Sequence, residues 1–252
     1  MKKFFNRLGS VYKYLKASGP VMKWRLSNSH CPNCHGKYFL SLDSNAFMTR
    51  CLKCSANVTN LSVIPVIEAH RENHAIETAW EMSTYGATLD YLKKNITHVY
   101  ESEYFPGSES GQFVNNVQHQ DVQNISFKDS SLDLITSNQV FEHVENDIQG
   151  FKECYRVLKQ GGVLIFTVPL FDIKSTQQLA RIENNKVIHL EKPEYHDSRR
   201  GGPNSALCFW RHSYFDIIDR VSKVGFQSEL IEIRIPESLK NPSYVIYAKK
   251  CY

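Results

Sequence analysis

The sequence predicts an α/β fold, in which helices flank a mainly parallel sheet and a small cysteine-rich module precedes it. Two strand-length apolar runs, at residues 132–135 and 163–168, enclose an amphipathic helix pattern, and this order of elements indicates a β-α-β unit. Two CxxC pairs lie upstream of that unit. The length of 252 residues and the hydrophobic content of 42% suit one α/β domain with a small appendage.

The first 26 residues form a basic arm. They contain seven Lys or Arg residues and no acidic residue, which leaves 23 basic against 26 acidic residues, a net charge of −3, in the rest of the chain. Phe4, Leu8 and Val11 recur at helical spacing, which predicts a short basic amphipathic helix. Such a helix could lie on an anionic membrane surface, bind RNA phosphates, or pack against the rest of the protein.

Residues 27–64 are predicted to form a four-cysteine zinc module resembling a zinc ribbon. Cys31 with Cys34, and Cys51 with Cys54, can each present two thiolates to one tetrahedral ion. We expect this zinc to be structural, because four thiolates leave no open coordination position. Seven cysteines, four of them in close pairs, favour a reducing compartment, and no apolar run reaches the roughly 20 residues that span a bilayer. We therefore expect a cytoplasmic protein without a transmembrane segment.

The segment 121–169 is the best-defined part of the domain that we expect over residues 65–252. Ile148, Phe151 and Cys154 fall on one face of its helix. We expect this helix to end in a turn at residues 159–162, where glycine can adopt the left-handed conformation, and the second strand to begin directly after it. A right-handed crossover then makes the two strands parallel and brings their carboxyl ends to one edge of the sheet.

Several short motifs lie in this domain: FxDxSLDLI at residues 127–135, ExxRVLxxGG at 153–162, TVP at 167–169, SEYF at 102–105, EHV at 142–144 and PEYH at 193–196. In these motifs the chain resembles class I S-adenosylmethionine-dependent methyltransferases, and in particular a bacterial group with the SEYF, EHV and PEYH patterns. The resemblance implies a Rossmann-like, seven-stranded methyltransferase sheet and S-adenosylmethionine as the cofactor.

The resemblance also implies which strand ends hold that cofactor. The first strand is expected at residues 74–78 with Glu77 at the acidic position, followed by a loop whose one glycine is Gly86. Trp80 and Met82 would project into this loop, where the family keeps glycines. The second strand, 97–102, leads to Glu103 as the acceptor for the ribose hydroxyls. The remaining cofactor contacts are expected from the ends of the third strand (117–120) and the fourth strand, at Asp121, Val122 and Asn138.

The methyl acceptor is expected on the side of an insertion at about residues 171–208. Three histidines are candidates for the base that takes a proton from the acceptor, because a neutral imidazole has a suitable pKa: His143, His189 and His196. The polar character of the insertion favours a small-molecule or saccharide acceptor. A helix at 214–224 and an antiparallel strand pair, 229–235 with 244–248, are expected to complete the sheet.

Two other functions stay open from the sequence. The chain could be an RNA methyltransferase that uses the zinc module and the basic arm, although the charge of −3 after residue 26 argues against a broad phosphate-binding surface. It could also be a non-catalytic scaffold that has the methyltransferase fold but a degenerate glycine loop. The identity of the acceptor cannot be read from the sequence.

Overall fold

A six-stranded sheet is the centre of the structure, a computed structural model that describes residues 24–42, 44–198 and 200–251. Its spatial order is β17-β18-β9-β8-β4-β5, in which β9, β8, β4 and β5 are parallel and the β18–β17 hairpin closes one edge in antiparallel register. The strands are β4 (Thr78–Glu81), β5 (His98–Glu101), β8 (Leu132–Asn138), β9 (Leu158–Thr167), β17 (Phe226–Ile233) and β18 (Ser243–Lys250).

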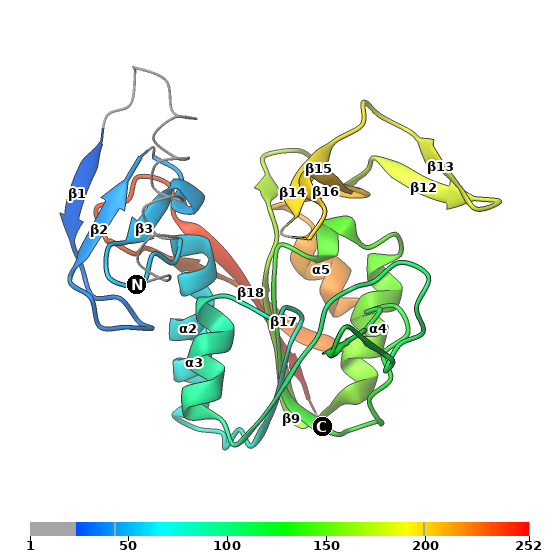
Figure 1. Cartoon of the computed structure of the whole chain (residues 1–252), viewed down its shortest axis with the longest axis horizontal. Coiled ribbons are helices and arrows are strands. Elements are labelled where there is room, and N and C mark those ends of the chain that lie inside the picture. The colour runs from blue at the N-terminus through cyan, green and yellow to red at the C-terminus, as the bar shows by residue number, and fades with distance from the viewer. Residues whose placement is uncertain (1–23, 43, 199, 252) are drawn as a thin grey trace.

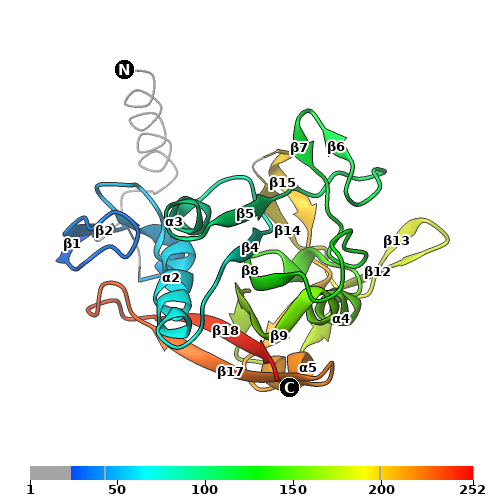
Figure 2. The same ribbon diagram turned by 90° about the horizontal axis from the view of Figure 1, so that it is seen from below.

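Two helices cover each face of this sheet in the described part of the chain. On one face lie α2 (Val58–Arg71) and α3 (Ala87–Asn95), and on the other lie α4 (Asp147–Val157) and α5 (Ile217–Ser222), as Figures 1 and 2 show. Each face has its own hydrophobic cluster, one around Leu61, Ile64 and Leu134 and the other around Phe141 and Phe151. The α/β class and the β8–α4–β9 unit are thus as predicted.

The expected count of seven strands is not confirmed, because the described residues place six strands in the sheet. The predicted third strand, 117–120, forms instead a hairpin of β6 (Phe113–Val114) and β7 (Val117–Gln118), joined to the sheet by one bridge between Glu103 and His119. Asn115 and Asn116 both have positive φ, 50° and 62°, as tight hairpin turns require. These residues therefore pair with each other in a hairpin and do not add a strand to the main sheet.

The first strand of the sheet begins later than expected. It is β4, Thr78–Glu81, rather than 74–78, because Ala79 and Trp80 are the side chains that the core buries. Glu77 consequently lies at the amino end of the strand, where its backbone N–H donates to Asp133 Oδ2. Its predicted place at the carboxyl tip is wrong, and Glu81 occupies that tip.

The two glycines after α4 lie inside β9 rather than in a helix cap. The strand starts at Leu158, directly after the helix, and its pairing with β8 is irregular between Leu132 and Leu134. Gly161 has φ +79°, and a Cβ on Gly162 would lie 2.9 Å from the carbonyl oxygen of Lys159. Glycine is needed here for a bulge in a buried strand.

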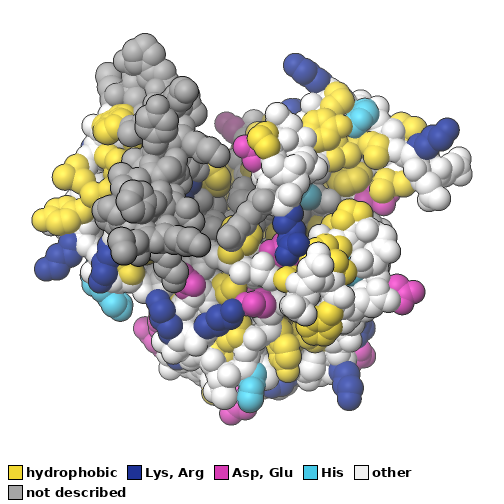
Figure 3. All heavy atoms as spheres, in the orientation of Figure 1, with side chains coloured by type: hydrophobic (Ala, Val, Ile, Leu, Met, Phe, Trp, Pro, Cys, Tyr) yellow, Lys and Arg dark blue, Asp and Glu magenta, His cyan; other side chains and the backbone are white. Residues whose placement is uncertain are grey.

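The insertion folds into small sheets beyond the carboxyl edge of the main sheet. One hairpin, β12–β13, protrudes from the molecule, and Figure 3 shows apolar side chains gathered over it, including exposed Ile182, Val187 and Leu190. A second hairpin, β14–β15, lies over the strand tips (Figure 1). The strands are β10 (Leu170–Phe171), β11 (Gln177–Gln178), β12 (Ala180–Glu183), β13 (Lys186–His189), β14 (Tyr195–Ser198), β15 (Gly202–Leu207) and β16 (Trp210–Ser213).

The cysteine module is a three-stranded sheet of β1 (Arg25–Asn28), β2 (Tyr38–Ser41) and β3 (Thr49–Cys51), with the short helix η1 (Ala46–Met48) before β3. Its buried residues Phe39 and Cys51 belong to the same hydrophobic cluster as α2 and one face of the main sheet. The expected boundary between residues 64 and 65 falls within α2. Most of the basic arm, residues 1–23, lies outside the described residues. Within the described ranges, no helix is both long and apolar enough to cross a membrane.

Candidate functional site

The site is built at the carboxyl ends of β4, β5 and β8, where the parallel strands end together. Glu81 at the tip of β4 is 2% exposed and accepts a hydrogen bond from the Thr136 hydroxyl of β8. Burial raises the pKa of this carboxyl to about 8, since the interior disfavours its charged form. Glu81 was not predicted, because the sequence analysis places the first strand at residues 74–78 and therefore assigns Glu81 to the loop that follows.

The loop between β4 and α3 leaves the strand tips open. Trp80 is buried and its indole N–H donates to Ser102 Oγ at 2.9 Å, while Met82 packs in the core on the α4 side of the sheet. The expectation that these two side chains project into the loop is therefore wrong. Gly86, with φ +115°, precedes the first turn of α3, a conformation that glycine adopts without strain.

Glu103 holds this loop in place. Its Oε1 accepts hydrogen bonds from the backbone N–H of Thr84 at 3.1 Å and from the Thr84 hydroxyl at 2.6 Å. Its Oε2 lies 3.9 Å from the guanidinium Nε of Arg200, which extends from the β14–β15 hairpin and stacks over Phe105 at 4.4 Å. The carboxylate thus faces the space between the loop and the hairpin, beyond the end of β5.

Asp121 and Val122 follow the β6–β7 hairpin, which is not a strand of the main sheet. Asp121 Oδ1 accepts from the backbone N–H of Gln123 at 2.9 Å, which fixes a tight turn. The Val122 side chain is 7% exposed and belongs to the cluster around Phe141.

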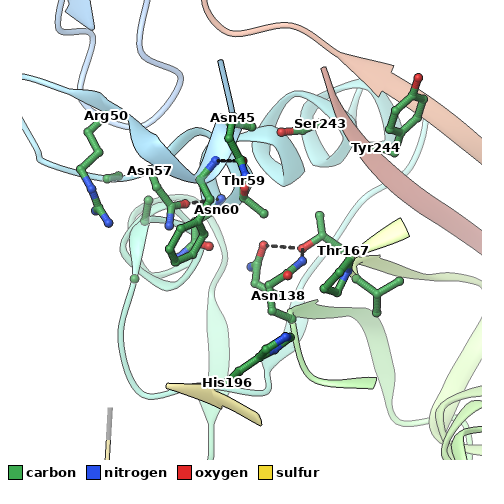
Figure 4. Close-up of a pocket in the computed structure, with 18 of the residues that line it drawn as sticks. Asn45, Arg50, Asn57, Thr59, Asn60, Asn138, Thr167, His196, Ser243 and Tyr244 are labelled. Atoms are coloured by element: carbon green, nitrogen blue, oxygen red, sulfur yellow. Dashed lines mark hydrogen bonds between the residues drawn. The ribbon is translucent and has the colours of Figure 1, made fainter. Parts of the chain in front are cut away.

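A large cavity of about 1220 Å³ opens between the cysteine module and the strand tips. Four of the residues predicted for cofactor binding or catalysis line it, namely Gly86, Asn138, His143 and His196, together with the predicted zinc ligand Cys54. Asn138 is fixed by two hydrogen bonds, from its Nδ2 to Thr88 Oγ1 at 3.0 Å and from Thr167 Oγ1 to its Oδ1 at 3.2 Å. Figure 4 shows Asn138 and His196 on one side of the cavity and Arg50, Asn57 and Asn60 on the other.

Amide and hydroxyl side chains dominate the polar lining of this cavity. They come from the cysteine module, from the first turn of α2, and from β8, β9 and β18, among them Asn33, Asn45, Asn57, Thr59, Asn60, Asn138, Thr167, Ser243 and Tyr244. Neutral donors and acceptors of this kind bind hydroxyl-rich molecules through hydrogen bonds. The contribution of the cysteine module to the wall could not be foreseen, since it depends on how α2 packs the module against the sheet.

His143 and His196 meet at the cavity wall, with ring centroids 5.0 Å apart and planes nearly perpendicular. His143 lies on the short helix η2 (Phe141–His143), its Nδ1 is 2.8 Å from the carbonyl oxygen of Leu207, and burial lowers its pKa. His189 is exposed on β13 and does not line this cavity. The structure thus brings together two of the three candidate histidines.

Two buried groups accompany these histidines and were not foreseen. Glu142 is 1% exposed, and its burial raises its pKa to about 8. Cys208 is 1% exposed, and burial raises its pKa to about 12. No sequence spacing connects these two residues, because the chain returns to η2 only after the β14–β15 hairpin.

The four cysteines of the module have the geometry of a tetrahedral metal site. The Sγ atoms of Cys31 and Cys54 are 3.8 Å apart and those of Cys34 and Cys51 are 3.5 Å apart, and all four lie within 4.8 Å of one another. A tetrahedron with Zn–S bonds of about 2.3 Å has S–S edges of about 3.8 Å. Each CxxC pair is followed directly by a residue with positive φ, 57° and 65°, so the two pairs form matching turns. The thiolates present fit one zinc ion.

Comparison with known proteins relates the central part of the chain to one family. Residues 82–166 match the family model described as "Methyltransferase domain". The chain is 30% identical over 81 residues to a "Probable S-adenosylmethionine-dependent methyltransferase" of Mycolicibacterium smegmatis. That match covers 32% of this chain and 28% of the length of the relative.

A solved structure shares the fold at low sequence identity. A 1,6-didemethyltoxoflavin-N1-methyltransferase of Burkholderia thailandensis, solved with 1,6-didemethyltoxoflavin and S-adenosylhomocysteine, is 11% identical with a TM-score of 0.51. The superposition covers 77% of this chain and 79% of that chain. An S-adenosylmethionine-dependent methyltransferase of Clostridium acetobutylicum is 14% identical with a TM-score of 0.47, over 76% of this chain and 91% of that chain.

Proposed function

We propose that this chain, whose residues 82–166 match the methyltransferase-domain model, is a class I S-adenosylmethionine-dependent methyltransferase that methylates a polar small molecule or saccharide. The observation that carries the acceptor class is the cavity at the strand tips, whose polar lining is made mainly of amides and hydroxyls. We further propose a structural zinc ion in the cysteine module and, from the free cysteines, a cytoplasmic location.

The cofactor would be held at the carboxyl edge by Gly86, Glu103, Asp121, Val122 and Asn138. Glu103 suits the ribose, because its Oε2, to which Thr84 does not donate, faces the space beside Arg200 and has lone pairs for hydroxyl donors. Glu81 takes the acidic position at the tip of the first strand in place of Glu77. Bound S-adenosylmethionine would supply a methyl group that is electrophilic because it is attached to a sulfonium.

The protein would then align the acceptor and receive its proton. Methyl transfer is an in-line displacement, so positioning of the acceptor oxygen or nitrogen is the main contribution of the cavity wall. His196 and His143 are the candidates on that wall, whereas His189 is on a hairpin outside it. A neutral imidazole can accept a proton from a hydroxyl or amine as the new bond forms.

Calorimetric titration with S-adenosylmethionine tests the cofactor site first, since a non-catalytic scaffold would bind none. Turnover is then measured with a panel of hydroxyl-bearing and amine-bearing small molecules and saccharides. His196→Ala should abolish turnover and leave cofactor affinity nearly unchanged, while His189→Ala, the matched control on the exposed hairpin, should retain both. Tight, steeply salt-dependent RNA binding together with methylation of RNA alone would replace this acceptor class by RNA.

A further inference from the structure

Glu142 and Cys208, which lie beside His143 and His196 behind the cavity wall, have no role in the proposed methyl transfer. One ligand atom from each of His143, His196 and Cys208 lies within 4.8 Å of the others. The residues come from η2, from β14 and from the segment directly after β15. Backbone hydrogen bonds from Cys208 to Glu194 and from Phe209 to Glu142, at 2.9 and 2.8 Å, fix these segments together. The arrangement is therefore built into the fold.

Glu142 is the most unusual member of this cluster. Its side chain is 2% exposed, and neither carboxylate oxygen has a hydrogen-bond partner among the described residues. The guanidinium of Arg211 is engaged elsewhere, with Glu194 at 2.6 Å. An unpaired buried carboxyl group is costly, so a cation between its oxygens and the neighbouring side chains would account for its position.

The His143 imidazole is oriented to present a lone pair to that position. Its Nδ1 faces the carbonyl oxygen of Leu207, which can only accept, so Nδ1 carries the proton and Nε2 is left as a lone pair. This Nε2 lies 3.7 Å from Glu142 Oε1. A lone pair directed at a carboxylate is unfavourable, and either a proton on the carboxyl group or a cation beside both groups relieves the repulsion.

His196 repeats the arrangement from the other side. Its Nδ1 also lies 3.7 Å from Glu142 Oε1, while its Nε2 faces Glu194 Oε1 at 3.7 Å. Histidines that bind metals usually donate their second ring N–H to a carbonyl or carboxylate oxygen, which fixes the ring and its tautomer. The two inward nitrogens thus converge on one carboxylate oxygen, and the Cys208 thiol lies close to the two imidazoles.

We propose that His143, His196 and Cys208 bind a second zinc ion, separate from the four-cysteine site, at the wall of the cavity and beside the buried carboxyl group of Glu142. Three protein ligands of nitrogen and sulfur leave the fourth coordination position of zinc open. His143 and His196 line the cavity, so the ion would be accessible from it. The inference rests on the proposed methyl transfer only for its consequence: with both imidazoles as ligands, the open fourth position of the ion would bind the acceptor hydroxyl and lower its pKa, and the hydroxyl proton would leave to water.

Zinc analysis of the purified full-length protein tests this site directly. The wild type should contain about two ions per chain and His196→Ala about one, because the four-cysteine site is untouched. His189→Ala is the matched control and should retain about two ions. His196 is at the surface of the cluster, with 34% of its side chain exposed, so the variant should remain folded.

Cobalt substitution provides a second readout that does not depend on activity. The zinc is removed and replaced by Co²⁺ in the wild type and in Cys208→Ser, and the visible absorption spectra are compared. The spectrum of Cys208→Ser should lack the ligand-field bands of the second site and keep those of the four-thiolate site. A wild type that contains only one ion, or a His196→Ala variant that binds as many ions as the wild type, overturns the proposal. Neither result bears on S-adenosylmethionine binding, so a failure here is distinct from a failure of the proposed methyl transfer.

Discussion

Two glutamates at the carboxyl side of the sheet are buried, and they differ in the hydrogen bonds that their carboxyl groups receive. Glu81 receives a hydrogen bond from Thr136, whereas Glu142 receives none from the described residues. For Glu81 the unfolded chain has an ordinary carboxyl pKa and the folded chain has a pKa of about 8. Between these two values the folded state binds more protons, so stability falls as the pH rises through that window.

Glu81→Gln should abolish this pH dependence. The amide keeps the size of the side chain and can still accept from Thr136, but it does not ionise. Between pH 5 and pH 8 the wild type should lose stability relative to the variant by on the order of 3 kcal/mol. Urea unfolding of both proteins at the two pH values measures this difference, and parallel curves would contradict a raised pKa at this position.

Glu103→Ala should weaken S-adenosylmethionine binding. Loss of a charged acceptor for the ribose costs on the order of 1.5–3 kcal/mol, or about 10- to 150-fold in Kd. Because Glu103 also holds the Thr84 loop, Thr84→Val serves as the control that removes the hydroxyl and leaves the carboxylate. Calorimetry on both variants separates the two roles. Equal losses in both would assign the effect to the loop and not to the ribose.

At the scale of secondary-structure elements, the charged residues of the sequence motifs mainly form hydrogen bonds that connect strands and helices. Asp133 on β8 accepts hydrogen bonds from the backbone N–H and the hydroxyl of Thr78 at 2.9 and 2.8 Å, which aligns β4 beside β8. Arg156 on α4 donates to the carbonyl oxygens of Ile125 and Phe127, at 2.8 and 3.1 Å, and so fixes the segment before β8. These contacts set where the strand tips end.

Asp147, at the start of α4, forms a buried ion pair within this layer. It is fully buried and bonded to Arg220 of α5 at 2.6 Å and to His212 of β16 at 3.1 Å. Burial alone would raise its pKa, but these two donors lower it, so its contribution to stability is lost as the pH falls through the lowered value.

Asp147→Ala should destabilise the protein by about 3–5 kcal/mol, because it leaves the charge of Arg220 without its partner in a largely buried site. Asp219→Ala, which removes an exposed carboxylate from α5, is the control and should change stability by less than about 0.5 kcal/mol. Thermal and urea unfolding at neutral pH measure both. A small effect at Asp147 would mean that Arg220 finds another acceptor.

The sequence predicted the elements with a strong hydrophobic periodicity correctly. It failed where the burial of a polar side chain determines the position of an element. The pattern around Phe151 and the apolar runs of β8 and β9 predicted the central unit. The first strand was displaced because Glu81 is polar yet buried, and hydrophobic patterns cannot signal a protonated carboxyl. The cysteine spacing predicted the four-thiolate cluster, whereas the meeting of Cys208 with His143 depends on a hairpin that returns across the sheet edge.

On the scale of the whole molecule, the cysteine module and the sheet share one hydrophobic cluster through α2. Phe39 and Cys51 of the module and Leu134 of β8 belong to the cluster that contains Leu61 and Ile64 of α2. A shared core of this kind makes the two parts fold together, unlike domains joined by a linker. The module is therefore a structural support for the sheet face that carries α3.

Cys34→Ser should remove the zinc of the module and unfold more than the module. Metal binding contributes directly to the folding of small cysteine modules, so the loss should reduce hydrogen-exchange protection in α2 as well as in β1–β3. Cys251→Ser, at a half-buried cysteine outside the proposed metal groups, is the control and should change neither zinc content nor protection. Protection of α2 that survives zinc loss would show that the two parts are independent.

The wall of the cavity is formed by both the cysteine module and the main sheet, so that binding in the cavity is coupled to metal binding in the module. Asn33 and Cys54 of the module line the cavity beside Asn138 from the strand tip, as do Asn60 of α2 and Asn57, which caps that helix. A molecule bound there contacts both the zinc-dependent part and the sheet. Binding equilibria coupled through one structure are reciprocal, so a ligand that holds α2 in place would raise zinc affinity by the same factor by which zinc raises the affinity for the ligand. Zinc occupancy would then set how tightly the protein retains its substrate.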